Sequence, residues 1–316
     1  MHGVAPAPAE LWTRFGTTWA LTPQQRRGMR SVSAGMSRWS RYPVRGSGIG
    51  RNHASFEVSV RHEPAGRSLR FIIDPLAYVD RHEEAVAIVT AHLRRWAPRS
   101  VAESSQELVV RQARLFPAHS GTFFAWLGAG VSASGAAHGK VYLNPWLSRS
   151  GAGLRGAEDI VSAFGARGLP TRRIKEVFDV VGPMVPHIVG VNLAAGTAAP
   201  KIYFCGPKAS RRRLVVLSRA WGLTSLERVL ASADLAQAGE VHVCLPCPPD
   251  RTTPAAPGSV SLSVPSWFRT PAAALAAVGG LVGEPAAGDW DVDVTPSFLG
   301  LGHDSVTVYA RTGPGP

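Results

Sequence analysis

The sequence predicts an α+β fold in which a closed, ten-stranded antiparallel β-barrel is surrounded by helices. Three observations lead to this prediction. Pairs of strand-like segments joined by short turns recur five times, at a spacing of roughly 60 residues, with helical segments between them. Two of these pairs share a Lys-x-Tyr pattern, Lys140-Val141-Tyr142 and Lys201-Ile202-Tyr203. The strands also have one polar and one apolar face each.

The strands are predicted from the alternation of polar and apolar residues and from turn residues at their ends. Segment 55–61 reads Ser-Phe-Glu-Val-Ser-Val-Arg, and a turn at 64–66 leads to a second strand at 69–74. Asp80 and Glu83 form a capping box that predicts a helix over 80–96. The later strands are predicted at 122–130, 140–144, 187–193, 200–205, 240–245, 260–264, 290–294 and 305–311, with helices at 157–164, 171–181, 211–220 and 272–282.

The first fifty residues do not follow this repeat of strand pairs and helices. They carry two helical patterns, at 9–19 and 24–39, followed by a Gly/Ser/Arg-rich stretch at 45–51. We therefore expect residues 1–50 to form a helical segment that packs on the barrel, and residues 51–316 to form a single barrel domain. One large barrel of this length is common among single-domain proteins.

Composition and charge narrow the class of protein. Hydrophobic residues make up 45% of the chain and charged residues 18%, as in an ordinary globular protein. The formal net charge of +12 is spread along the chain, mostly as arginine in helical patterns. We interpret it as surface charge, with an anionic small substrate or a nucleic acid as alternatives. Three cysteines, no apolar run long enough for a membrane helix and no secretory signal pattern favour a cytoplasmic protein without a membrane partner.

Polar residues on the strands are predicted to face the barrel lumen. Residues i, i+2 and i+4 of a strand share a face, and the helices need an apolar sheet face to cover. The opposite arrangement, with polar faces turned to water as in a plain sandwich, is the alternative. A barrel of more than about eight strands has room inside for a ligand. The predicted lumen set is Ser55, Glu57, Ser59, Arg61, Arg70, Asp74, Lys140, Tyr142, Asn144, Lys201, Tyr203, Thr307, Tyr309 and Arg311.

This lumen set predicts a site for a compact polyanion next to a carbocation. A ring of Arg70, Lys140 and Lys201 would bind a diphosphate through charge-assisted hydrogen bonds. The tyrosine two residues beyond each lysine would stabilise an allylic cation, by about 0.5–2 kcal/mol per ring. Glu57 would hold, or accept a proton from, an aromatic nucleophile.

With these residues in place, the chain resembles the bacterial branch of the tryptophan dimethylallyltransferase family, which are aromatic prenyltransferases. The resemblance covers about residues 55–311 and depends on the order and spacing of several short motifs. They are Phe56-Glu57-Val58-Ser59, Leu69-Arg70-Phe71-Ile72-Ile73-Asp74-Pro75-Leu76, Lys140-Val141-Tyr142-Leu143-Asn144-Pro145, Gly190-Val191-Asn192-Leu193, Pro200-Lys201-Ile202-Tyr203-Phe204, Val243-Cys244-Leu245, Val260-Ser261-Leu262-Ser263-Val264-Pro265 and Val306-Thr307-Val308-Tyr309-Ala310-Arg311.

The resemblance implies a barrel of five α-β-β-α repeats (the PT-barrel, or ABBA fold) and a metal-independent transfer. The family ionises dimethylallyl diphosphate, lets an electron-rich ring attack the cation, and then loses a proton. Glu57 matches the carboxylate that bonds the indole N–H, and we predict it as the catalytic residue, with Trp126 beside the acceptor. The predicted prenyl diphosphate site consists of Arg70, Lys140, Tyr142, Lys201, Tyr203, Tyr309 and Arg311.

Several positions depart from the family pattern. Ala199 stands where the family usually has an arginine. In the next hairpin, Ser261-Leu262-Ser263 stands where a Gln-x-Tyr or Lys-x-Tyr pattern is expected. Thr307 occupies a common tyrosine position, for which Tyr309 is a substitute. The strand before the first Lys-x-Tyr carries Trp126, where some members have a lysine that relays a proton. These gaps leave open the prenyl chain length and the acceptor, which includes free tryptophan or a tryptophan within a peptide.

The predicted function is therefore transfer of a dimethylallyl or longer prenyl group to an indole ring, without a cofactor and with the prenyl diphosphate as co-substrate. We expect small-molecule or peptide substrates, no nucleic acid, and a monomer or homodimer. The alternatives are a phenol or naphthalene prenyltransferase of the same architecture, a basic nucleic-acid-binding module, and a catalytically inactive barrel.

A CxxC motif, Cys244-Leu245-Pro246-Cys247, is the one further pattern of chemical interest. A zinc site needs two more ligands, and Cys205 with His242 would be an unpatterned completion. A redox motif would begin a helix, whereas Pro248 and Pro249 follow here. We interpret the cysteines as structural and expect no metal site.

Overall fold

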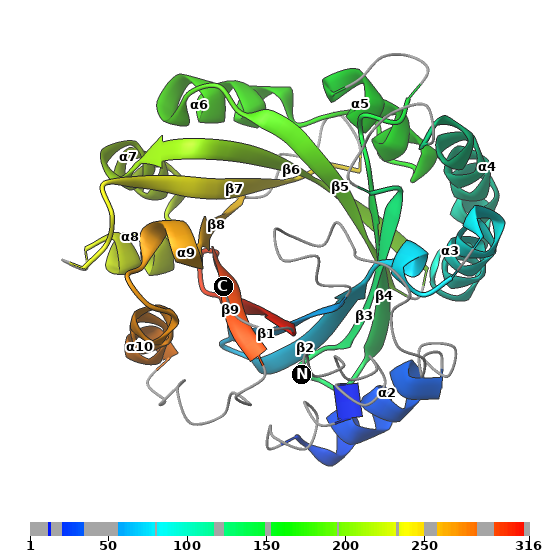
Figure 1. The fold of residues 1–316 in the computed structure, drawn as a ribbon, viewed down its shortest axis with the longest axis horizontal. Coiled ribbons are helices and arrows are strands. Elements are labelled where there is room, and N and C mark those ends of the chain that lie inside the picture. The colour runs from blue at the N-terminus through cyan, green and yellow to red at the C-terminus, as the bar shows by residue number, and fades with distance from the viewer. Residues whose placement is uncertain are drawn as a thin grey trace, which may run out of the picture.

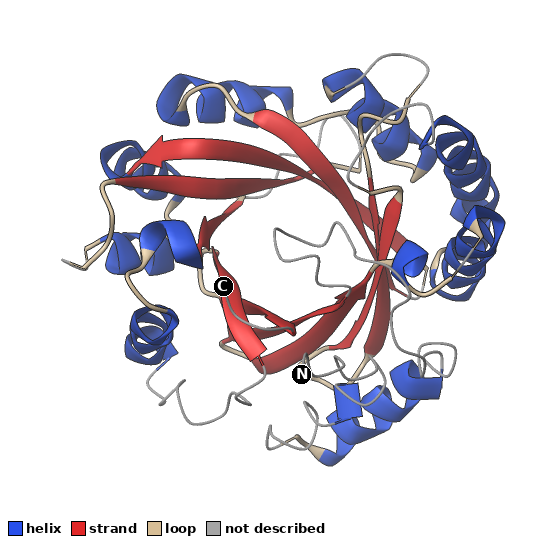
Figure 2. Cartoon of the chain, viewed as in Figure 1, coloured by secondary structure: helices blue, strands red, loops and turns tan. Residues whose placement is uncertain are grey.

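Ten antiparallel strands form a closed barrel in the computed structural model, which describes residues 12–13, 21–34, 56–79, 81–116, 123–148, 153–194, 196–231, 234–249, 258–282 and 294–312. The strand order is β1-β10-β9-β8-β7-β6-β5-β4-β3-β2, so each strand pairs with its neighbours in sequence and β1 closes the barrel against β10. Figure 1 shows the barrel viewed along its lumen, and Figure 2 shows strands enclosed by helices. The predicted fold class is confirmed.

The strands come in five consecutive hairpins, as predicted. Their bounds are β1 Phe56–Glu63, β2 Gly66–Ile73, β3 Ala125–Val131, β4 Ala137–Leu143, β5 Val185–Ala194, β6 Thr197–Ser210, β7 Ala238–Pro246, β8 Ser259–Ser263, β9 Val294–Leu301 and β10 Val306–Thr312. The helices are α2 Pro23–Ala34, α3 His82–Trp96, α4 Arg99–Leu115, α5 Leu154–Ala163, α6 Thr171–Val181, α7 Arg211–Trp221, α8 Thr224–Leu230, α9 Val264–Trp267 and α10 Pro271–Val282, with a 3₁₀ turn η2 at Pro75–Ala77.

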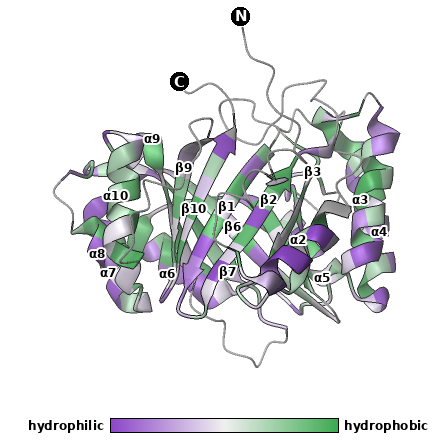
Figure 3. Ribbon diagram, turned by 90° about the horizontal axis from the view of Figure 1, so that it is seen from below, coloured by the Kyte–Doolittle hydropathy of each residue, from purple (hydrophilic) through white to green (hydrophobic). Residues whose placement is uncertain are grey.

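The hydrophobic core lies between the outside of the barrel and the helices. On β1, Val58 and Val60 are buried, and so are Leu69, Phe71 and Ile73 on β2. On β1, these side chains alternate with Glu57, Ser59 and Arg61, and Figure 3 shows hydrophilic and hydrophobic bands on the strands. The polar faces therefore line the lumen, and the alternative of a plain sandwich with its polar faces in water is wrong.

The surrounding helices have the amphipathic pattern that such a layer requires. In α6, Ile174 and Val177 are buried, while Lys175 and Asp179 form an exposed ion pair of 2.6 Å. The basic pair at the start of this helix likewise bonds Glu176, at 3.2 and 2.8 Å. This part of the positive charge thus belongs to a solvated helix surface. No described helix has the length and apolar character needed to cross a bilayer.

Some elements differ from the prediction. Helices α4 and α8 were not predicted, although both bury an apolar stripe. The ninth strand runs over Val294–Leu301 rather than 290–294, and residues 290–293 lie outside the described part. The predicted capping residue Asp80 also lies outside it; α3 begins at His82 after Arg81, which makes no side-chain cap bond.

Two residues predicted to face the lumen instead stabilise turns at strand ends. Asp74 accepts a hydrogen bond of 3.0 Å from the backbone N–H of Leu76 and caps η2. Asn144 donates to the carbonyl of Phe123 at 2.9 Å and accepts from the N–H of Trp146 at 2.9 Å. Both lie one residue beyond the paired segment, where the alternation of a strand no longer sets the side-chain direction.

The described parts of the N-terminal segment contact the outside of the barrel near β2 to β4. The Gln25 amide donates to the carbonyl of Arg67 at 2.7 Å, and Gly28 lies so close to the β3–β4 turn that a Cβ atom would be 2.3 Å from the Gly135 carbonyl oxygen. The ring of Trp12 meets Phe71 edge-on at 5.1 Å. The division at residue 50 stays a prediction, because residues 35–55 lie outside the described part.

Candidate active site

The two Lys-x-Tyr strands, β4 and β6, lie on either side of β5, and Gly190 of β5 is the residue between them. Gly190 pairs with Tyr142 on one side and with Lys201 on the other. A Cβ atom at Gly190 would lie 3.0 Å from the Tyr203 ring, 3.1 Å from the Tyr142 ring and 3.2 Å from the Lys140 side chain. The missing side chain therefore leaves the space in which the two Lys-Tyr pairs meet.

Contacts between the two strands confirm that these side chains meet. The Lys140 ammonium donates a hydrogen bond of 2.9 Å to the Tyr203 hydroxyl. It also lies 4.5 Å from the ring centroid of Tyr142 and 5.4 Å from that of Tyr203, within cation–π range. The two rings are 6.3 Å apart. A cation in the lumen would thus be bordered by two aromatic faces, one from each strand.

We expect Gly190→Ala to weaken anion binding at this site without unfolding the chain. The added methyl group must push aside two tyrosine rings and a lysine stem, and overpacking of this kind costs about 1–3 kcal/mol. The dissociation constant for inorganic pyrophosphate, measured by calorimetry, should rise by about tenfold. Gly280→Ala is the control, because no atom lies within 4 Å of a Cβ atom there. Unchanged affinity in the Gly190 variant would show that the tyrosines do not border the anion site.

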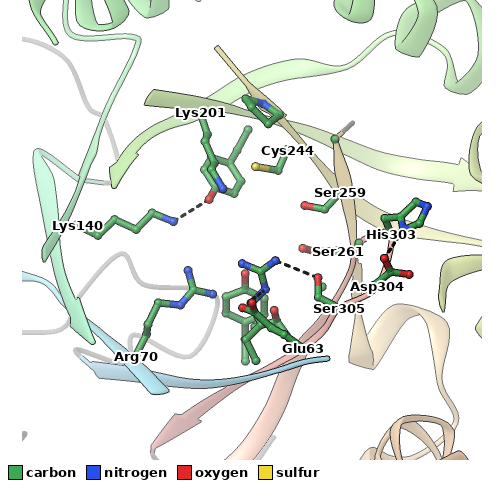
Figure 4. Close-up of a pocket in the computed structure, with 18 of the residues that line it drawn as sticks. Glu63, Arg70, Lys140, Lys201, Cys244, Ser259, Ser261, His303, Asp304 and Ser305 are labelled. Atoms are coloured by element: carbon green, nitrogen blue, oxygen red, sulfur yellow. Dashed lines mark hydrogen bonds and ion pairs between the residues drawn. The ribbon is translucent and has the colours of Figure 1, made fainter. Parts of the chain in front are cut away.

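A cavity of about 330 Å³ opens beside these residues, and cations from four strands face it. Figure 4 shows Arg70, Lys140 and Lys201 directed into the same space. No described carboxylate forms an ion pair with any of these three side chains. Hydroxyl groups complete the lining, from Tyr203, Ser259, Ser261, Ser305, Thr307 and Tyr309. The cavity is therefore a concentrated positive site with hydrogen-bond donors, which suits a phosphate-like anion.

Burial and mutual repulsion shift the pKa values of the two lysines downward. The pKa of Lys140 lies well below its usual value, first because of burial and then because of the charges of Arg70 and Lys201. Burial also lowers the pKa of Lys201. Burial acts to lower the pKa of Arg70 as well, but Tyr309, Tyr142 and Tyr203 more than offset it, so that the guanidinium stays charged. A bound anion would relieve the repulsion among these cations.

Anion binding should therefore weaken with rising pH and should be accompanied by proton uptake. An anion binds the charged lysines, whose pKa values in the free protein are depressed, so that affinity falls as pH rises through those lowered values rather than near the usual 10.5. Sulfate is the suitable probe, because its own charge is constant over this range. Calorimetry in buffers of different ionisation enthalpy would measure the proton uptake; no uptake and a flat pH profile would contradict the depressed values.

Arg70 and Tyr309 extend the site onto β2 and β10. Ser59 of β1 pairs with both of them, so the three side chains point into the lumen at one level. Arg70 and Tyr309 both line the cavity. Gly130 lies opposite Arg70 on β3, where a Cβ atom would be 2.5 Å from the Arg70 side chain. Tyr309 thus borders the cavity beside the cations, in line with its predicted place in the donor site.

Glu57 lies towards the other end of the lumen and is bound to Arg311. The Arg311 Nε donates to a carboxylate oxygen of Glu57 at 3.3 Å, and the Ser297 hydroxyl donates to the same oxygen at 3.3 Å. Burial raises the pKa of Glu57, although Arg311 and Ser297 partly offset this. The sequence assigns Arg311 to the diphosphate; in the structure its guanidinium bonds Glu57 and does not line the cavity. Arg311 is thus placed to orient the carboxylate.

An apolar wall adjoins both Glu57 and the cationic cavity. Glu57 pairs with Ile72 of β2, and Ile72 packs with the aromatic residues of neighbouring strands. Phe123 and Trp126 stack at 4.1 Å, and Trp126 lies 6.5 Å from Tyr142. The wall consists of Ile72, Phe123, Trp126, Tyr142 and Ile188, with Tyr203 packed against it. One side of the lumen is therefore suited to a flat aromatic or allylic group.

Sequence reasoning missed several of these residues. Phe123 precedes β3 and enters the lumen from a loop, where strand alternation gives no signal. Ile72 lies on the same face of β2 as Arg70, but it is apolar, so a pattern of polar lumen residues did not indicate it. His138 has a pKa lowered to about 4, first by burial and then by Arg70, and is therefore neutral beside the cations.

Among the described residues, no group of three or more potential metal ligands includes the CxxC cysteines. Cys244 and Cys247 are buried and unoxidised. Potential ligand atoms of Cys205, Glu240 and His242 lie within 4.8 Å of one another, and His242 and Glu240 form an ion pair of 3.5 Å. This group lies on β6 and β7 and does not include the CxxC cysteines.

Comparison with solved structures shows the same fold in bacterial prenyltransferases. The chain superposes on the 5-dimethylallyl tryptophan synthase from Streptomyces coelicolor in complex with DMASPP and Trp with a TM-score of 0.69 and 18% identity, covering 99% of this chain and 98% of that one. The 6-dimethylallyltryptophan synthase from Micromonospora olivasterospora, also in complex with DMASPP and Trp, gives 0.66 and 16%, covering 97% and 98%. The apo form of the prenyltransferase PriB gives 0.68 and 18%, covering 96% and 94%. Comparison with protein-family models and with curated protein sequences found no match.

Proposed function

We propose that the chain is an aromatic prenyltransferase that transfers a dimethylallyl or longer prenyl group from its diphosphate to an indole ring. The observation that carries the proposal is the order of three environments along one lumen. A cationic cavity with Arg70, Lys140 and Lys201 comes first, the tyrosine rings and the apolar wall follow, and buried Glu57 comes last. A prenyl diphosphate and a flat acceptor with an N–H group need these environments in this order.

The first step is ionisation of the donor. The C1–O bond of the allylic diphosphate breaks, and its electron pair leaves with the diphosphate. The cations of the cavity stabilise the departing negative charge in a partly dry site, where electrostatic stabilisation is strong. Tyr142 and Tyr203 face the allylic cation, in the positions from which they now contact the Lys140 ammonium.

The second step is attack by the acceptor ring. A π electron pair of the ring forms the new C–C bond to the allylic carbon, and the ring then loses a proton to restore aromaticity. The Glu57 carboxylate accepts a hydrogen bond from the indole N–H, which raises the electron density of the ring, and its pairing with Ile72 of the apolar wall places it to accept the released proton. Trp126 of the wall provides a stacking surface for the acceptor.

We infer that the reaction needs no metal ion, because arginine and lysine side chains supply the positive charge that a divalent cation would otherwise bring to the diphosphate. The complexes of the two tryptophan synthases with DMASPP and Trp support a tryptophan-type acceptor, and we propose that it is either free tryptophan or a tryptophan within a peptide. We further propose a cytoplasmic enzyme of secondary metabolism that acts on small molecules or peptides, as a monomer or homodimer, with residues 51–316 as its barrel domain.

The proposal is tested by incubating the purified chain with dimethylallyl diphosphate and L-tryptophan in EDTA, followed by mass spectrometry. We expect a product that carries one dimethylallyl group, and equal rates with and without added magnesium. Geranyl diphosphate, a tryptophan-containing peptide and a dihydroxynaphthalene test the chain length and the acceptor class. Failure to prenylate any indole or phenol would overturn the proposed activity.

A further inference from the structure

Arg61 of β1 faces the same cavity as the three predicted diphosphate ligands. It lies two and four residues beyond Ser59 and Glu57 on the lumen face, and it pairs with Ser68 of β2 and Thr307 of β10. Together with Arg70, Lys140 and Lys201, it lines the cavity. Its place on the strand is at the opposite end of the lumen from Glu57.

The guanidinium of Arg61 has two partners at the edge of the cavity. Its Nε lies 3.0 Å from a carboxylate oxygen of Glu63, and its Nη2 donates to the Ser305 hydroxyl at 3.2 Å. The side chains of Arg61 and Glu63 are 39% and 32% exposed, so this ion pair is open to water. Figure 4 shows Glu63 and Ser305 at the border of the space into which Lys140 and Lys201 point.

The charges around the cavity do not balance. Among the described residues that line it, four are lysine or arginine and two are carboxylates, Glu63 and Asp304. Asp304 pairs with His303 at 2.6 Å, so Glu63 is the described carboxylate of the lining that forms an ion pair with one of these cations. The positive charge of Arg61 contributes to lowering the pKa of Lys140 and of Lys201, after burial and the nearer cations. The guanidinium therefore acts electrostatically on the space between these lysines.

We propose that Arg61 is a further ligand of the donor diphosphate and that Glu63 holds it by an ion pair until the diphosphate replaces the carboxylate. This proposal rests on the proposed function, whose donor site it completes. A solvent-exposed ion pair is a weak interaction. A forked guanidinium–phosphate contact is charge-assisted and frequently bidentate, and it is the stronger of the two. The exchange requires a change of side-chain rotamer and no movement of the barrel strands.

The test measures the binding of inorganic pyrophosphate by calorimetry in a double-mutant cycle. Arg61→Gln should raise the dissociation constant by about tenfold or more, because one charge-assisted contact is lost. Glu63→Gln should lower it about threefold, because the competing carboxylate is gone. In the Arg61→Gln background, Glu63→Gln should have no effect. Arg212→Gln is the matched control: this residue is exposed on α7 and removes the same charge far from the lumen.

Each outcome separates this inference from the proposed function. Arg61→Gln with the affinity of the Arg212 control overturns the role of Arg61, while turnover by the parent chain would leave the proposed function standing. Equal effects of Glu63→Gln in both backgrounds would show that Glu63 acts by its field alone and overturn the ion-pair exchange. A parent chain that binds no pyrophosphate overturns both.

In turnover, Arg61→Gln should raise KM for the donor and leave KM for the acceptor unchanged. Arg61→Lys keeps the charge but loses the forked guanidinium, so its KM for the donor should lie between those of the parent chain and Arg61→Gln. Thermal unfolding of each variant checks that the fold is retained.

Discussion

Replacing Glu57 by glutamine should reduce the rate of prenyl transfer by about 10²- to 10⁴-fold, the range for loss of a positioned general base. The amide has nearly the same shape but cannot carry the negative charge that polarises the indole N–H or takes up the proton. Pyrophosphate affinity should change little, because Glu57 bonds Arg311 and Ser297 and does not line the cationic cavity. Single-turnover kinetics with dimethylallyl diphosphate and tryptophan would measure the effect on the chemical step.

The pH dependence of the rate gives an independent readout of the same residue. The carboxylate form is the active one, and burial raises the pKa of Glu57 above its usual value, so the rate of the parent chain should fall as pH decreases through that raised value. The Glu57→Gln variant should lack this acidic limb. Ser297→Ala, which removes one hydrogen bond but leaves the carboxylate, is the control and should keep it. An acidic limb that persists without Glu57 would assign the base to another group.

Replacing Lys140 by glutamine should raise the dissociation constant for pyrophosphate by about 10- to 100-fold, because a charge-assisted hydrogen bond of about 1.5–3 kcal/mol is lost. The substitution also removes the donor of the 2.9 Å bond to the Tyr203 hydroxyl, so the ring loses an anchor. The turnover rate should therefore fall as well as the donor affinity. Calorimetry and steady-state kinetics with varied donor concentration separate the two effects.

Lys208 provides the matched control for this change. It belongs to β6, like Lys201, but is exposed and does not line the cavity. Lys208→Gln removes one positive charge from the chain and should leave both pyrophosphate affinity and turnover unchanged. Equal losses in the Lys140 and Lys208 variants would mean that the anion responds to the net charge of +12 rather than to the lumen.

Strand alternation was sufficient to place the two Lys-Tyr pairs on one wall of the lumen. The Lys-x-Tyr pattern fixes a cation and a ring on one face of each strand, and two such strands were predicted and found with one strand between them. The pairing of β1 with β10 joins the two ends of the sheet, which are far apart in the sequence. The bond between Glu57 and Arg311 depends on that closure, and no spacing in the sequence carries it.

The apolar wall was less accessible to sequence reasoning for a different physical reason. Phe123 lies before its strand and Ile72 is apolar on a face expected to be polar, so neither has a periodic signal. Helix α4 was not predicted, although its buried residues have helical spacing. Arg61 was placed on the lumen face from alternation alone, but only the shared cavity and the Glu63 contact give it a role.

A crystal structure of the chain with a dimethylallyl thiolodiphosphate and tryptophan would test the central claim most directly. We expect the diphosphate in contact with Arg70, Lys140 and Lys201, the allyl group between the Tyr142 and Tyr203 rings, and the indole N–H within hydrogen-bond distance of Glu57. Electron density for the diphosphate outside the lumen, or an indole turned away from Glu57 with the lumen empty, would contradict the assignment of this barrel as the site of prenyl transfer.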